Sequence, residues 1–169
     1  MGLDGVEDGV HACTVTALED GEVCAIPYRR WLEVCGNGGA GLRERMHRML
    51  GVELARARRL KLLLTLAHAE PRVAAFLLMI SARMAARGYS PFDFQLRMSR
   101  ADIGSYLGLT LETVSRSLSA LDRHGWIEVS KKHVHLLCPE QLAALCEAEV
   151  PGSGVPRITP HRGRDVLVA

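Results

Sequence analysis

The hydrophobic residues of this chain recur mainly at helical spacing, and the longest such pattern runs from about Leu42 to Ala67. That stretch contains no proline and a single glycine, Gly51. Its apolar positions advance by steps of four, three and seven, which is typical of a coiled-coil seam. We therefore expect a long helix that pairs with a second copy of the chain, and packing of the seam on its own domain is the alternative. The predicted dimerisation residues are Met46, Leu50, Leu54, Ala57 and Leu64.

A second pattern, from Met98 to Leu121, predicts two short helices joined by a tight turn. Ser99 and Asp102 have the spacing of a capping box, which satisfies free amides at a helix start. Gly108 can adopt the left-handed conformation that ends the first helix. Thr110 can cap the second helix. The apolar faces comprise Ile103, Tyr106 and Leu107 on the first helix, and Val114, Leu118 and Leu121 on the second. Two helices around such a turn indicate a helix-turn-helix motif.

The other face of the second predicted helix is polar and carries Glu112, Thr113, Ser115, Arg116 and Ser117. In a helix-turn-helix the N-terminal part of this helix enters the major groove of DNA. Arginine can bind guanine through two hydrogen bonds, glutamate can accept from cytosine, and serine can play either role. A polar face on an unrelated helical domain is the alternative. The predicted DNA-binding residues are Ser99, Arg100, Thr110, Glu112, Thr113, Ser115, Arg116, Lys131 and Lys132.

The N-terminal region shows strand-like alternation rather than helical spacing. Two strands are predicted, about His11 to Thr16 and Glu22 to Ile26, joined by an acidic turn at residues 19–21. Two strands cannot form a stable sheet alone, so the segment resembles the end of a larger β-domain. Pro27 then opens a short helix that ends at Gly36.

The region around the helix-turn-helix has its own pattern. Pro71 opens a helix whose buried face holds Val73, Phe76, Leu77, Ile80 and Met84, and the loop after it runs from Tyr89 to Phe94. Residues 126–130 and 133–137 alternate across Lys131-Lys132, which predicts a hairpin wing with two lysines near the DNA backbone. Residues 139–149 predict a last helix, and the Pro-, Gly- and Arg-rich segment from Pro151 predicts a disordered tail.

Charge is distributed unevenly along the chain. Net charge is only +2, but residues 1–36 hold two arginines against seven acids, a net charge of −5. Residues 37–132 hold sixteen basic residues against eight acids, a net charge of +8, and this part includes the predicted helix-turn-helix. A basic region is what a phosphate-binding surface requires, although solvated helix positions account for part of it. No apolar run has the length of a membrane span and no secretory signal is evident, so we expect a cytoplasmic protein.

The helix-turn-helix residues resemble those of the CRP/FNR superfamily of bacterial transcription regulators, with Glu112, Ser115 and Arg116 supplying the E-x-x-S-R pattern of the FNR branch. The resemblance extends through residues 69–76 and 87–91 and covers about residues 3–146. It implies a central dimerisation helix and TTGAT-like half-sites, with Arg116 on the guanine. It also implies RNA polymerase as a candidate partner, near the acidic turn and the Tyr89–Phe94 loop. Most of the family's sensory β-roll would precede Met1, so either the protein is short or its start lies further upstream.

Cysteine use bears on a possible cofactor. Oxygen-sensing FNR relatives hold a 4Fe-4S cluster with four cysteines, and the resemblance matches Cys24 to one of them. The other three have no counterpart, so no cofactor is expected unless a longer N-terminus exists. Cys24 is instead expected to be a buried strand cysteine. His133, His135 and Cys138 suggest a metal site because alternate strand residues share a face, but a fourth ligand is missing.

Together these patterns predict an α+β fold that is mostly helical. The expected regions are a β-roll remnant with a short helix (1–36), a dimerisation helix (37–68), a winged helix-turn-helix domain (69–139) and a short helix with a tail (140–169). The predicted function is a homodimeric, sequence-specific transcription regulator that binds double-stranded DNA. The alternative is an interaction protein that pairs with a longer FNR-like relative and modulates it. No arrangement of nucleophile and base suggests an enzyme.

Overall fold

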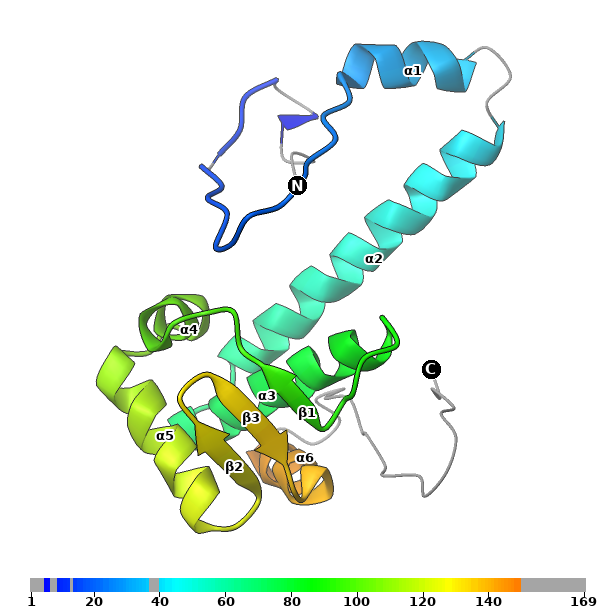
Figure 1. Ribbon diagram of the computed structural model, residues 1–169. Coiled ribbons are helices and arrows are strands. Elements are labelled where there is room, and N and C mark those ends of the chain that lie inside the picture. The colour runs from blue at the N-terminus through cyan, green and yellow to red at the C-terminus, as the bar shows by residue number, and fades with distance from the viewer. Residues whose placement is uncertain (1–4, 7–8, 13, 37–39, 150–169) are drawn as a thin grey trace. The chain divides into compact units, whose positions relative to one another are not determined.

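The chain forms two compact units, residues 1–55 and 56–169. The computed structural model describes residues 5–6, 9–12, 14–36 and 40–149 (Figure 1). In the first unit, α1 (Tyr28–Gly36) follows Pro27 as the sequence predicts. The Trp31 indole N–H donates to the Met46 sulfur at 2.9 Å, so α1 partly covers this residue of the predicted seam.

The two N-terminal strands predicted from alternation are wrong for the residues that the structure describes. Residues 11–12, 14–16 and 22–26 form no strand and are all exposed. Val15 and Val23 are 60% and 77% exposed. A pair of strands is stable only when an apolar face packs on something. The described residues between 5 and 36 present no such layer. Cys24 is likewise exposed rather than buried.

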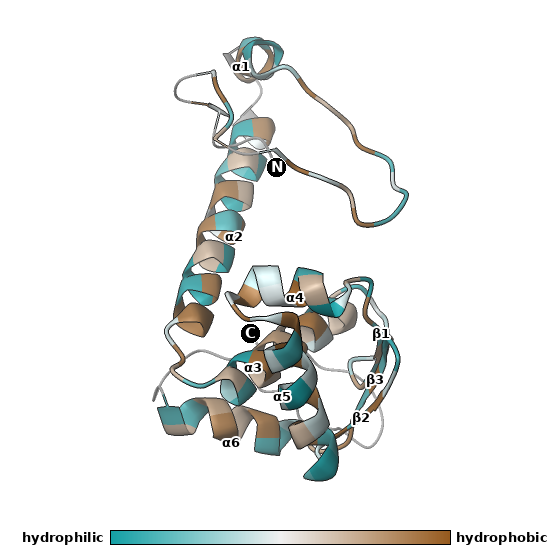
Figure 2. Cartoon of the chain, turned by 90° about the vertical axis from the view of Figure 1, so that its left-hand side faces the viewer, coloured by the Kyte–Doolittle hydropathy of each residue, from teal (hydrophilic) through white to brown (hydrophobic). Residues whose placement is uncertain are grey.

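Helix α2 (Ala40–Leu64) is the predicted long helix and continues through Gly51. Its predicted seam is largely uncovered within one chain, since Leu54 is 65% exposed and Leu50, Ala57 and Leu64 are also exposed. Hydrophobic and hydrophilic residues alternate along it in Figure 2. Near its end the pattern changes, because the side chains of Leu63 and Leu66 enter the core of the second unit.

The second unit is built around α3 (Ala69–Ala85), which packs against α5 (Leu111–Arg123) and α6 (Pro139–Glu149). Pro71 lies in the first turn of α3, where its missing N–H breaks no helical bond. Phe76 of α3 contacts the ring of Tyr106 in α4 (Arg100–Leu107), with centroids 5.9 Å apart. One continuous core therefore links the helices, as the predicted apolar faces required.

A three-stranded antiparallel sheet completes this unit, in the order β1-β3-β2. The predicted wing is confirmed as β2 (Ile127–Ser130) and β3 (His133–Leu136). The third strand, β1 (Asp93–Gln95), falls at the end of the expected loop. Its Phe94 pairs with Val134 and is buried, so a single inward side chain attaches this short segment to the core.

The last predicted helix is confirmed with the expected bounds as α6, whereas the predicted tail from Pro151 lies outside the described residues. Among the helices of the described ranges, none combines the length and the hydropathy that a membrane crossing needs.

The close approach of Gly104 to the backbone of Leu109 lets us predict the effect of Gly104→Ala. A Cβ at Gly104 would lie 2.6 Å from the carbonyl oxygen of Leu109, inside the turn. Because this neighbour is backbone, we expect a loss of about 1 to 3 kcal/mol in the free energy of unfolding, measured by denaturant titration. Ser105→Ala, at an exposed position of the same helix, is the control and should change it by less than about 0.5 kcal/mol. Equal stability of the two variants would contradict the close packing of the turn.

Candidate nucleic-acid interface

The first helix of the motif begins with the predicted capping box. The amide of Asp102 donates to the Ser99 hydroxyl at 3.2 Å, and the amide of Ser99 donates to the Asp102 carboxylate at 2.8 Å. Hydrogen bonds from the hydroxyl and amide of Ser99 lower the pKa of Asp102 below its usual value, and the charge of Lys132 lowers it further. The Ser99 side chain, which the sequence predicts to bind DNA, therefore already takes part in the helix cap.

The turn between α4 and α5 brings the two helices together (Figure 1). Gly108 has a φ of 65°, and the amide of Leu109 donates to the carbonyl of Gly104 at 2.9 Å. A left-handed residue at this point favours glycine because a Cβ would be strained. Thr110 then caps α5, its hydroxyl accepting from the amide of Thr113 at 3.2 Å. This local chemistry fixes where α5 starts.

Helix α5 presents a polar face at its N-terminal end. Glu112 and Arg116 are exposed, while Thr113 and Ser115 are half-buried. Spacings of three and four residues place Glu112, Ser115 and Arg116 along one side of the helix. Ser117 does not belong to this face and is 3% exposed, which corrects the prediction. It stands three residues after Val114 and four before Leu121, so helical geometry puts it on the buried stripe.

The wing turn lies beside the start of α4. Lys131, with a φ of 56°, and Lys132 are both exposed at the turn. The Arg100 guanidinium donates to the carbonyl of Lys131 at 2.9 Å, and partial burial lowers the pKa of Arg100. The amide of Leu96 donates to the carbonyl of Lys132 at 2.8 Å. Arg100 is thus placed to hold the turn that carries the two lysines, a role the sequence pattern does not suggest.

Histidines of the wing pair with a carboxylate of β1. His133 Nε2 and His135 Nδ1 lie 2.7 Å and 3.4 Å from the two oxygens of Asp93. The hydrogen bond with His133 is the main cause of the lowered pKa of Asp93. Cys138, the third residue of the metal interpretation, instead contacts the carbonyl of Gly125 at 3.8 Å. Across the part of the chain that the structure describes, no group of three His, Cys, Asp or Glu residues is arranged to hold a metal ion.

Comparison with known proteins agrees with this geometry. Residues 71–145 match the family described as "Crp-like helix-turn-helix domain". The chain is 39% identical over 145 residues to the fumarate and nitrate reduction regulatory protein of Salmonella typhimurium, covering 86% of this chain and 58% of that one. It is 40% identical over 152 residues to the transcriptional activator protein Anr of Pseudomonas protegens, covering 90% of this chain and 62% of that one.

A solved structure shows the same fold. The structure of FixK2 from Bradyrhizobium japonicum superposes with a TM-score of 0.60 at 36% identity, over 69% of this chain and 57% of that one. A capped helix-turn-helix with a hairpin wing defines the chain as a protein of the winged helix-turn-helix class. By these matches it belongs to the CRP/FNR family. The chain spans about three fifths of the length of the two curated relatives named above.

The contact between Arg100 and the wing turn predicts a local effect of Arg100→Ala. One hydrogen bond contributes about 0.5 to 1.5 kcal/mol, so the Leu96 amide should exchange with solvent roughly two- to tenfold faster. Amides in the middle of α3 should exchange at the wild-type rate. The control is Arg123→Ala, an exposed arginine of α5. Unchanged exchange at the Leu96 amide in Arg100→Ala, measured by NMR, would remove this role from Arg100.

Proposed function

We propose that the chain is a sequence-specific transcription regulator that binds an inverted repeat of TTGAT-like half-sites as a homodimer. The observation that carries this proposal is the polar N-terminal face of α5, with Glu112, Ser115 and Arg116 on one side. The caps at Ser99 and Thr110 hold both helices of the motif in place. In this class of domain such a face enters the major groove.

Each of these three residues makes a different kind of contact with the bases. Arg116 is exposed and its planar guanidinium matches the two acceptors of a guanine. Glu112 accepts from a neighbouring base, and Ser115 bonds at close range because its side chain is short. Lys131 and Lys132, exposed on the wing, bind phosphates and add affinity without sequence preference.

Base recognition by Arg116 predicts a sequence-dependent loss. Arg116→Ala should cost about 1 to 3 kcal/mol of binding free energy and relax the preference at one base pair of each half-site. Titration against duplexes that vary each position in turn measures both effects. Lys132→Ala is the comparison: it should weaken binding to all sequences alike and lower the salt slope by about 1. If Arg116→Ala weakened all duplexes equally, its role in base recognition would be wrong.

Pairing through α2 supplies the second half of the proposal. Leu50, Leu54, Ala57 and Leu64 are exposed along one helix, and a second copy of that helix would cover them. An inverted repeat calls for a two-fold axis in the protein. Residues 9–26 also expose apolar side chains, including Val10 and Leu18. The alternative is an interaction protein: a longer FNR-like relative pairs with the chain through residues 42–67 in place of a second copy, and co-purification of mixed dimers tests it.

Two matched substitutions test the seam. Leu54→Lys and Val52→Lys each replace an exposed apolar residue of α2, but only Leu54 belongs to the predicted seam. Burying a leucine contributes about 1.5 to 3 kcal/mol, and a dimer buries two. Leu54→Lys should therefore raise the dimer Kd by roughly a hundredfold or more, whereas Val52→Lys should leave it close to wild type. Sedimentation at micromolar concentration measures this. A monomeric wild-type chain would contradict dimerisation through α2.

A further inference from the structure

The junction between α2 and α3, residues 65–68, is held on several sides to the second compact unit, which we call the DNA-binding unit. Both the end of α2 and the whole of α3 belong to the compact unit of residues 56–169. Leu63 and Leu66 flank the start of the junction and are 6% and 1% exposed, packed in the core of that unit. The buried side chains of Leu63 and Leu66 therefore anchor the start of the junction in the core of this unit.

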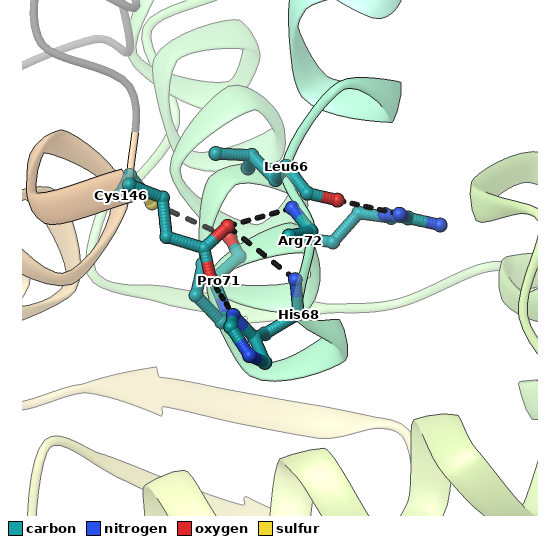
Figure 3. A network of polar contacts seen from close by, with 7 residues as sticks. Leu66, His68, Pro71, Arg72 and Cys146 are labelled. Atoms are coloured by element: carbon teal, nitrogen blue, oxygen red, sulfur yellow. Dashed lines mark hydrogen bonds and ion pairs between the residues drawn. The ribbon is translucent and has the colours of Figure 1, made fainter.

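The Arg72 guanidinium binds a backbone carbonyl of the junction. Arg72, in the first turns of α3, donates from one terminal nitrogen to the carbonyl of Leu66 at 2.5 Å (Figure 3). Its other terminal nitrogen donates to the carbonyl of Leu107 at 3.1 Å. Leu107 is the last residue of α4, the first helix of the DNA-binding motif. The rigid fork of a guanidinium thus connects the junction to the motif.

The Glu149 carboxylate binds two backbone amides of the junction. Glu149, the last residue of α6, accepts from the amides of Ala67 at 2.7 Å and His68 at 3.4 Å. Its other carboxylate oxygen contacts Nδ1 of His68. His68 is the N-cap of α3 and gives no side-chain cap of its own. Glu149 therefore satisfies free amides from a distant part of the chain, where a negative charge also suits the helix dipole.

The ionised state of Glu149 follows from these contacts. Burial raises the pKa of this carboxyl group, but hydrogen bonds from the His68 side chain and from the amides of His68 and Ala67 lower it more. The net pKa lies below the usual value, so the carboxylate is charged at neutral pH.

Helix α6 carries a second contact to the start of α3 on the same side. The Cys146 thiol, three residues before Glu149, donates to the carbonyl of Pro71 at 3.3 Å. Burial, followed by the charges of Glu149 and Glu147, raises the pKa of Cys146 to about 12, so the thiol keeps its proton and can donate. The residue is fully buried. Two contacts from one helix thus define where α3 begins.

We propose that Glu149 and Arg72 are positioning residues for DNA binding, because they fix the direction in which α2 leaves the DNA-binding unit. The proposal rests on the dimeric function proposed above. Two recognition helices must lie one helical turn of DNA apart to read an inverted repeat. Each half of the dimer connects to the paired α2 helices through this junction, so its direction sets that separation. Neither residue needs to touch DNA.

The test compares spacing preference with half-site affinity in the full chain. Four duplexes are used: an inverted repeat with half-sites one helical turn apart, the same repeat lengthened or shortened by about two base pairs, and a single half-site. The variants are Glu149→Ala, which removes the acceptor, and Glu149→Gln, which keeps a neutral acceptor. Glu140→Gln, an exposed glutamate at the other end of α6, is the control.

Glu149→Ala should keep single-half-site affinity within about twofold and lose about tenfold of the preference for the correct spacing, the scale of hydrogen bonds to a charged group. Glu149→Gln should lose less, and Glu140→Gln should match wild type. Wild-type spacing preference in Glu149→Ala would overturn the proposal. An equal loss of affinity on all four duplexes would also overturn it, because a general loss of folding produces that result. Glu149→Gln is measured on the same duplexes because it disturbs the fold less. A wild-type chain without spacing preference would contradict the proposed function, and the positioning role with it.

Discussion

The close backbone contact in the turn between α4 and α5 is the constraint on which the rest of the DNA-binding unit depends. Gly104 can approach the carbonyl of Leu109 only because it has no Cβ, and Gly108 takes the left-handed conformation that lets the chain reverse. With the turn fixed, Thr110 caps α5 and starts it in one register. That register sends Val114, Ser117, Leu118 and Leu121 into the core and leaves Glu112 and Arg116 outside. The polar face of α5 is therefore a consequence of the backbone geometry of the turn that precedes this helix.

Polar contacts tie the other elements to this motif. The Asp122 carboxylate of α5 accepts from the amide of Val129 at 3.1 Å, which anchors β2 to the second helix. Arg100 of α4 donates to the wing turn, and Arg72 of α3 donates to the last carbonyl of α4. Each link joins a charged side chain to a backbone group of another element. The motif, the wing and α3 are thus connected through charged side chains.

Local patterns predicted most of this unit because its signals are local. The capping box, the left-handed Gly108, the hairpin wing and α6 all depend on residues within a few positions of one another. Contacts between distant residues could not be read in this way: Glu149 meets Ala67 across 82 positions, and β1 is a strand only because β3 lies beside it. The predicted N-terminal strands failed for the same reason, since an alternating pattern forms a strand only where a partner covers it. The assignment of individual residues to DNA and to the dimer stays a prediction.

The most direct measurement is binding of the purified 169-residue chain to a TTGAT-type inverted repeat and to a scrambled duplex, at low and at physiological salt. Phosphate contacts alone bind both duplexes and weaken steeply with salt, whereas base contacts separate the two. We expect the inverted repeat to remain bound at physiological salt when the scrambled duplex has dissociated. Equal binding to both duplexes, lost together as salt rises, would contradict a sequence-specific reader built on α5.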